Sequence, residues 1–158
     1  MTEGPNRIAE IGLDDTLGRR ARPEQEHDRA VAIQDLLDEN VFRLSDGPGG
    51  PYRLELGVDG GRLLIRVRAL AEEETTVFGL ALGPFRRIIK DYFTICDSYF
   101  EAIRVMTPSQ IEAVDMGRRG LHNEGAEKLM DRLKGRAEID ITTARRLFTL
   151  LCVLHARG

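Results

Sequence analysis

The sequence of 158 residues contains no tryptophan, few serines and only two cysteines. Cys96 and Cys152 both lie among apolar residues at helical spacing, where a free cysteine behaves as a small buried side chain. Neither belongs to a CxxC pair, so we expect no disulfide, redox or zinc role for them. None of the serines has a neighbour that would activate it, which argues against a serine nucleophile.

Long apolar runs are also absent. No stretch approaches the roughly 20 residues that span a bilayer, and the N-terminus has no apolar signal-peptide region. We therefore expect a cytoplasmic protein with no membrane partner. The net charge is −3, whereas a general nucleic-acid binder is usually basic, so we expect no nucleic-acid partner.

Recognisable cofactor and metal motifs are missing as well. The sequence has no Walker-type glycine loop, no Rossmann fingerprint and no nucleophile elbow. Its histidines, His27, His122 and His155, share no ligand spacing. We therefore expect neither a cofactor nor a metal site.

The N-terminal half predicts one helix and several strands. We expect a single domain spanning residues 1–158, in which residues 1–22 form a loosely ordered segment. Within that segment, the apolar stretch 8–13 predicts an edge strand, and residues 18–22 predict an arginine-rich linker. A helix is expected from Pro23 to about Asn40. A turn at 46–51 then precedes strands at 52–58, 63–67 and 76–82, with a hairpin at Asp59-Gly60.

These strands alternate apolar and polar residues, which predicts an antiparallel meander with one dry face. The other face would carry Arg53, Arg62, Arg66, Arg68 and Glu55. Such a face is either solvated or able to contact an anion or a protein partner. Solvation is the simpler interpretation.

The C-terminal half is mainly helical. Apolar residues recur at intervals of three and four from Phe85 to Ile103, which predicts a central core helix. Thr107 to Gln110 forms a capping-box pattern. Residues 137–141 predict a short extended piece, and the last, very apolar helix that follows should be capped by Thr142 or Thr143. We therefore predict an α+β fold in which a small antiparallel sheet of three or four strands packs against a mostly helical C-terminal half.

The segment Asp115–Glu127, with sequence DMGRRGLHNEGAE, contains three glycines inside a helical region. Each glycine costs about 1 kcal/mol in a helix relative to alanine. This predicts a break in which Gly117 ends one helix, residues 118–122 form a loop and Asn123 caps the next helix. The glycines also suit a close backbone approach.

Several side chains of this segment form a candidate site. If it stays helical, Asp115, Arg118 and His122 share one face, and His122 becomes a candidate general base or acid supported by Asp115 or Glu124. Arg118, Arg119 and Asn123 would then bind an anionic substrate. The structural alternative is that these residues bridge helices, with His122 bonded to a backbone carbonyl.

Two functions compete. The first is a non-enzymatic regulatory or protein-interaction protein, expected to form a homodimer through its apolar helices. The alternative is a small enzyme or ligand-binding protein that uses the Asp115–Glu127 segment to bind an anionic metabolite. A concave pocket with His122 at its wall would favour the alternative.

Three segments of the chain carry a family resemblance. PFRRIIKDYFTICDSYFEAI, TPSQIEAVDMGRRGLHNEGAE and TARRLFTLLCVLHARG resemble an uncharacterised alphaproteobacterial protein family of unknown function, UPF family 0262. The resemblance implies a bacterial cytosolic protein. It assigns no reaction, cofactor or functional residue to this chain.

Overall fold

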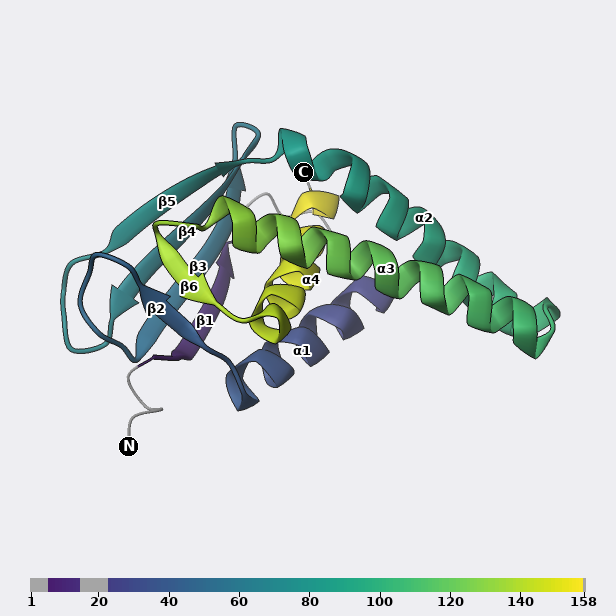
Figure 1. Cartoon of the computed structure of the whole chain (residues 1–158), viewed down its shortest axis with the longest axis horizontal. Helices are drawn as coiled ribbons and strands as arrows, with labels where there is room; N and C mark the ends of the chain where they lie inside the picture. The colour runs from purple at the N-terminus through teal and green to yellow at the C-terminus, as the bar shows by residue number, and fades with distance from the viewer. Residues whose placement is uncertain (1–5, 15–22, 158) are drawn as a thin grey trace.

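The computed structural model describes residues 6–14 and 23–157. In this part of the chain a four-stranded sheet lies beside a group of helices, two of which extend far beyond the rest of the molecule (Figure 1). The predicted α+β class is confirmed. The predicted linker at residues 18–22 lies outside the described residues.

The main sheet has the strand order β1-β3-β4-β5, with β1 at Ile8–Asp14, β3 at Tyr52–Asp59, β4 at Arg62–Ala69 and β5 at Thr76–Ala81. The last three strands form the predicted antiparallel meander. The predicted edge strand is also present, but it runs parallel to β3, so the sheet is mixed. The parallel pairing follows from the crossover between the two strands, which contains helix α1 at Pro23–Asp38.

The β3–β4 hairpin forms at the predicted position. Asp59 pairs with Arg62, and the two residues between them, Gly60 and Gly61, have φ values of 61° and 76°. Both angles lie in the left-handed region that glycine adopts without strain, as tight hairpin turns require. Along both strands buried and partly exposed residues alternate, which confirms one dry face.

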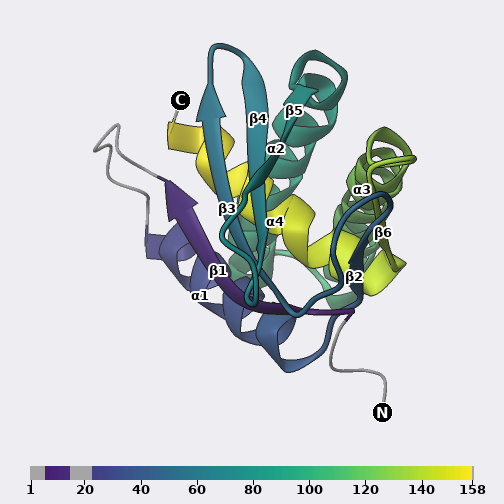
Figure 2. The same cartoon turned by 90° about the vertical axis from the view of Figure 1, so that its left-hand side faces the viewer.

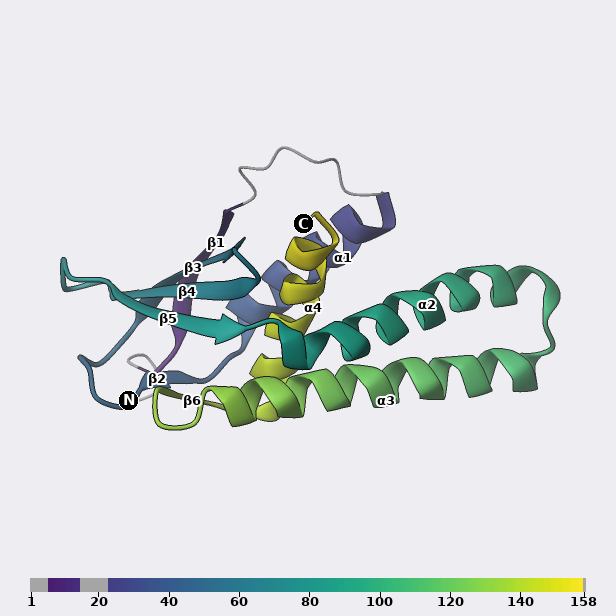
Figure 3. The ribbon, with the colours of Figure 1, turned by 90° about the horizontal axis from the view of Figure 1, so that it is seen from above.

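Helix α4, at Ile141–Arg157, is the centre of the core. It lies between the sheet and the other helices (Figures 2 and 3), and Phe148, Leu150 and Leu151 are fully buried. The backbone N–H of Thr143 donates to Oδ1 of Asp140, 2.9 Å away. The helix is thus capped by Asp140 rather than by the predicted threonines, because the aspartate precedes the first helical residue and can reach the unpaired N–H groups.

Helices α2 (Gly83–Val105) and α3 (Pro108–Arg132) form an antiparallel hairpin, seen side by side in Figure 3. The predicted capping box at their junction is confirmed, since Thr107 Oγ1 accepts from Gln110 N and Gln110 Oε1 accepts from Thr107 N. Only the first half of α2 belongs to the core. Its second half extends past the body, with Phe100 43% and Ile103 52% exposed.

Helix α3 is continuous through all three glycines, so the predicted break and loop at 117–123 are wrong. Two of the glycines are instead sites of close helix packing. A Cβ on Gly117 would come within 2.6 Å of Ile95 Cδ1 on α2, and one on Gly125 would overlap the Phe148 ring on α4. Tertiary packing therefore offsets the cost of glycine in this helix.

A second, two-stranded sheet pairs β2 (Phe42–Leu44) with β6 (Ala137–Ile139). The predicted extended piece at 137–141 accounts for β6, whereas its partner was not predicted. No helix in the described part of the chain is long and apolar enough to cross a membrane.

Candidate functional site

A cavity of about 420 Å³ lies where α1, α2, α3 and α4 meet. This volume is within the usual range for sites that hold small molecules. Its wall is mixed in character, with arginines and polar side chains on one side and aromatic rings on the other. The lining residues are His27, Val31, Ala32, Asp35, Tyr92, Cys96, Tyr99, Phe100, Arg118, His122, Thr142, Arg145, Arg146 and Thr149.

The charge of the cavity wall is positive. Among the residues whose side chains the structure describes, Arg118, Arg145 and Arg146 line it, against the single carboxylate of Asp35. Arginine remains protonated at any physiological pH and offers several N–H donors in a planar fork. The wall therefore favours an anion over a cation.

Arg145 is the arginine best placed to bind an anion. Its Nε donates to Oδ1 of Asn123 over 2.6 Å, which fixes the plane of the guanidinium. Among the described residues, its two Nη groups donate no hydrogen bond. A held guanidinium with unused donors is suited to a carboxylate or a phosphate.

Arg146 lies next to Arg145 and has an incompletely satisfied guanidinium. Its Nη1 donates to the carbonyl of Thr142 over 3.3 Å. Its Nε is buried and has no hydrogen-bond partner in the described structure, since the nearest carboxylate oxygen, Oδ2 of Asp35, lies 4.0 Å away. A buried donor without an acceptor is costly, so an additional acceptor at this wall would stabilise the protein.

His122 forms part of the wall and bridges α3 to α4. Its Nε2 lies 2.9 Å from both the carbonyl oxygen of Arg145 and Oγ1 of Thr149. Because a carbonyl only accepts, Nε2 carries the proton and donates to it. The ring stacks on Tyr92 with centroids 5.6 Å apart.

The surroundings of His122 favour its neutral imidazole. Burial lowers its pKa below the ordinary value, and the nearby charges of Arg118, Arg145 and Arg146 lower it further, against the raising effect of the hydrogen bond to the Arg145 carbonyl. Desolvation and like charge both disfavour the imidazolium.

Asp115 organises two of the predicted arginines from outside the cavity. Its Oδ1 accepts from Nε and Nη2 of Arg118 at 3.2 and 2.7 Å, and its Oδ2 lies 2.9 Å from Nη2 of Arg119. The hydrogen bond from Arg118 lowers the pKa of Asp115. Arg118 in turn lies over the ring of Tyr99, 5.6 Å from its centroid.

The predicted site residues thus divide into two groups. Arg118 and His122 line the cavity, whereas the other four are not among its lining residues. Asn123 holds Arg145, Glu124 pairs with Arg87 of α2, and Arg119 is largely exposed. The continuous helix brings Asp115, Arg118 and His122 onto one face, as the helical alternative anticipated.

The α4 side of the cavity was not predicted. Thr142, Arg145, Arg146 and Thr149 all come from this helix. Two adjacent arginines in a largely apolar helix were the available signal, because charged residues are rarely buried without a partner. Within the described residues, no group of three or more His, Cys, Asp or Glu side chains could hold a metal ion.

Comparison with known proteins gives a family. The model of the uncharacterised protein family UPF0262 matches residues 5–157. The chain belongs to this family. A UPF0262 protein of Agrobacterium fabrum is 53% identical over 158 residues and covers all of both chains. UPF0262 proteins of Rhizobium meliloti and of Chelativorans sp. are each 57% identical over 152 residues, which cover 96% of this chain and 96% and 94% of theirs.

These relatives are alphaproteobacterial, which agrees with the resemblance noted in the sequence. No solved structure gives a significant match to the chain. The cavity and its charges are therefore the basis for a functional proposal.

Proposed function

We propose that this protein binds a small anionic molecule with an aromatic or other flat apolar part in the cavity between its four helices, and that binding rather than catalysis is its role. The observation that carries the proposal is the position of Arg145 in the cavity wall, where Asn123 holds its guanidinium and no described residue accepts a hydrogen bond from its Nη groups.

The cavity lining can contact both the anionic part and the flat apolar part of such a ligand. Arg145 and Arg146 lie on α4 together with the hydroxyls of Thr142 and Thr149, which suits a carboxylate or phosphate group. Tyr92, Tyr99 and Phe100 line the cavity from α2, where a flat apolar group would stack or pack edge to face.

A binding role agrees better with His122 than a catalytic one. Its Nε2 proton is used to bridge α3 and α4, and its lowered pKa makes it a weak base. The predicted roles of Asp115 and Glu124 as catalytic partners have no support from the cavity lining. A regulatory role remains compatible with the proposal, because ligand binding is a common input to regulation.

The test is a series of probes that share one ring and differ in charge: phenylacetate, phenyl phosphate, neutral phenylacetamide and cationic phenethylamine. Fragments of this size bind weakly, so thermal shift and calorimetry should extend to about 10 mM. We expect the two anions to raise Tm and the neutral and cationic probes to leave it unchanged.

Two variants form a matched control. Arg118→Gln removes a lining arginine and Arg119→Gln its neighbour, and both arginines contact Asp115. The anion effect should weaken in Arg118→Gln, disappear in Arg145→Gln and persist in Arg119→Gln. Equal Tm shifts with the anions and phenylacetamide, or unchanged binding in Arg145→Gln, would contradict the proposal.

A further inference from the structure

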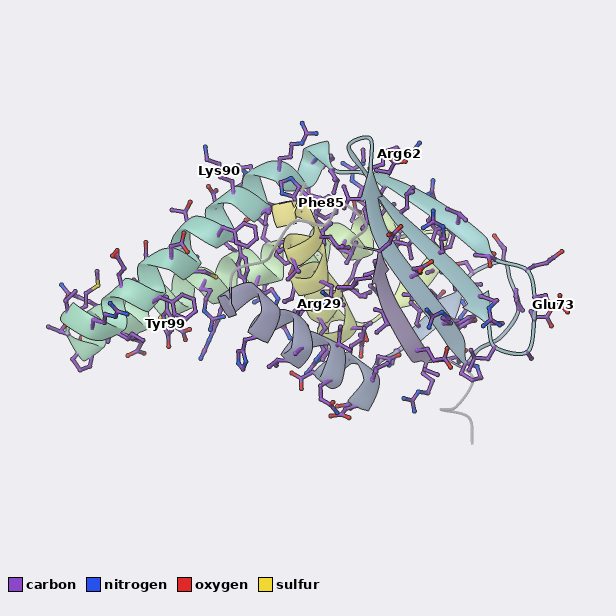
Figure 4. The ribbon with its side chains drawn as sticks, turned by 180° about the vertical axis from the view of Figure 1, so that it is seen from behind. Arg29, Arg62, Glu73, Phe85, Lys90 and Tyr99 are labelled. Carbon is purple, nitrogen blue, oxygen red and sulfur yellow. The ribbon has the colours of Figure 1, made fainter. Side chains whose placement is uncertain are left out.

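The outer face of α2 carries an unusual order of charges. Arg86 and Lys90, four residues apart, lie near its N-terminus, and Asp97 and Glu101, also four residues apart, lie toward its C-terminus. Asp97 follows Arg86 by 11 residues, and Glu101 follows Lys90 by the same number. Eleven residues make about three turns, so all four side chains lie along one stripe of the helix. All four residues are exposed, and Lys90 points away from the body in Figure 4.

This order is unfavourable within a single helix. The N-terminus of a helix carries a partial positive charge and its C-terminus a partial negative one, so basic residues belong at the end and acidic residues at the start. The first turn of α2 contains no acidic residue and includes Arg86, whereas its last turn contains the basic Arg104. The helix dipole therefore does not explain the position of Arg86.

An antiparallel copy of the same helix does explain it. A two-fold axis between Phe93 and Thr94 places Arg86 opposite Glu101 of the second copy, and Lys90 opposite its Asp97. Both pairs have the same midpoint, so a single two-fold axis forms both contacts. The axis also repeats each contact on its other side, as in an isologous interface. The stripe is complementary to itself.

The apolar residues of the α2–α3 hairpin also favour a second copy of the protein at this surface. None of the described residues in the range 97–120 is buried, so this part of the hairpin has no core of its own. Phe93 lies partly buried at the proposed axis, and Phe100, 43% exposed, lies one turn beyond Asp97. A pair of helices without buried side chains is marginal alone and gains stability from a further packed layer.

We propose that two copies of this protein associate through antiparallel α2 helices, with Phe93 near the two-fold axis and the Arg86/Lys90 pair of each copy facing the Asp97/Glu101 pair of the other. The contact from Arg86 to Glu101 is about 24 Å long, which gives an interface at the small end of the specific range. We therefore expect a micromolar dimer that weakens with added salt. The two proposals share Phe100, which also lines the ligand cavity, but the four charged residues of the stripe are not among the lining residues.

Charge-reversal variants test the pairing by sedimentation velocity from about 5 to 200 µM, a range that brackets a micromolar Kd. Arg86→Glu/Lys90→Glu should be monomeric, as should Asp97→Lys/Glu101→Lys. An equimolar mixture of these two variants should form a heterodimer, and the variant with all four changes should again form a homodimer. The matched control Arg132→Glu/Lys134→Glu makes the same charge change on exposed residues elsewhere and should dimerise like the wild type.

We expect both double variants to remain folded, because they bring α2 closer to the charge order that its dipole favours. Tm measured on each variant checks this, and Glu101→Lys alone, which should raise Kd at least several-fold, provides a milder change. A wild type that stays monomeric at 200 µM in low salt overturns the proposal. The proposal is also overturned if Arg86→Glu/Lys90→Glu still dimerises, or if the equimolar mixture of the two double variants does not associate. Either result would indicate another surface or another partner.

Discussion

Gly125 of α3 lies directly against the ring of Phe148 on α4, so closely that an added Cβ would overlap the ring carbons. Both residues are buried, and Phe148 has no exposed surface. The absence of a side chain at Gly125 is what lets the two helices approach at this point. The contact lies beside the cavity, because His122, one helical turn away, also contacts Phe148, with ring centroids 5.8 Å apart.

We expect Gly125→Ala to destabilise the protein. The extra methyl group must displace Phe148 or separate α3 from α4, and overpacking of this kind costs about 1–3 kcal/mol. Urea unfolding followed by circular dichroism measures the change in the free energy of unfolding.

Gly120→Ala is the matched control in the same helix. Nothing lies within 4 Å of the Cβ position there, so the substitution changes only helix propensity. It should raise the free energy of unfolding by about 0.8–1 kcal/mol. If both alanine variants changed stability in the same direction, close packing would not be the reason for Gly125.

These glycines show where prediction from sequence stopped. Local propensity correctly predicted the capping box at Thr107, the Asp59-Gly60 hairpin and the apolar α4, because each depends on residues close in the sequence. The same propensity wrongly divided α3 at Gly117. What keeps α3 helical is contact with Ile95 and Phe148, on other helices, and no local pattern contains that information.

The candidate site was half predicted for a similar reason. Arg118 and His122 could be selected because helical spacing places them on one face. Arg145 and Arg146 lie more than 20 residues further along, and only the packing of α4 against α3 brings them to the same cavity. The role of Asn123 likewise became visible only through its hydrogen bond to Arg145.

Asn40 provides a second test of a long-range contact. Its Oδ1 accepts from the N–H of Ile8 over 2.6 Å, and its Nδ2 donates to the carbonyls of Ile8 and Leu36 over 3.0 and 2.7 Å. The side chain thus links the start of β1 to the end of α1. Asn40→Ala removes all three hydrogen bonds and should lower the free energy of unfolding by about 1–3 kcal/mol.

Hydrogen exchange gives the local readout for this prediction. The amide of Ile8 should exchange faster in Asn40→Ala than in the wild type, since its acceptor is gone. Glu39→Ala, at the exposed neighbouring position, serves as the control and should leave Ile8 unchanged. Similar exchange of Ile8 in both variants would mean that Asn40 does not hold the strand.

The stability of the protein should fall as the pH drops below about 6.5, the ordinary pKa of histidine in an unfolded chain. Burial lowers the pKa of His122, and it also lowers the pKa of His155, with a further lowering from the charge of Arg86. In this window the unfolded chain binds protons that the folded protein does not, so acid favours unfolding. Above this pH window the two histidines are neutral in both the folded and the unfolded protein, so they no longer make stability depend on pH.

The variant His122→Gln/His155→Gln isolates this effect, because glutamine has no titrating group and its amide can replace the Nε2 donor of His122. Urea unfolding between pH 7.5 and pH 5 should show a smaller loss of stability in the variant than in the wild type. The NMR titration of His122 should have its midpoint below the ordinary value. Equal pH dependence in both proteins would show that other groups account for the acid sensitivity. The lowered pKa of Asp115 acts only at more acidic pH, below the ordinary pKa of aspartate, and leaves this comparison unaffected.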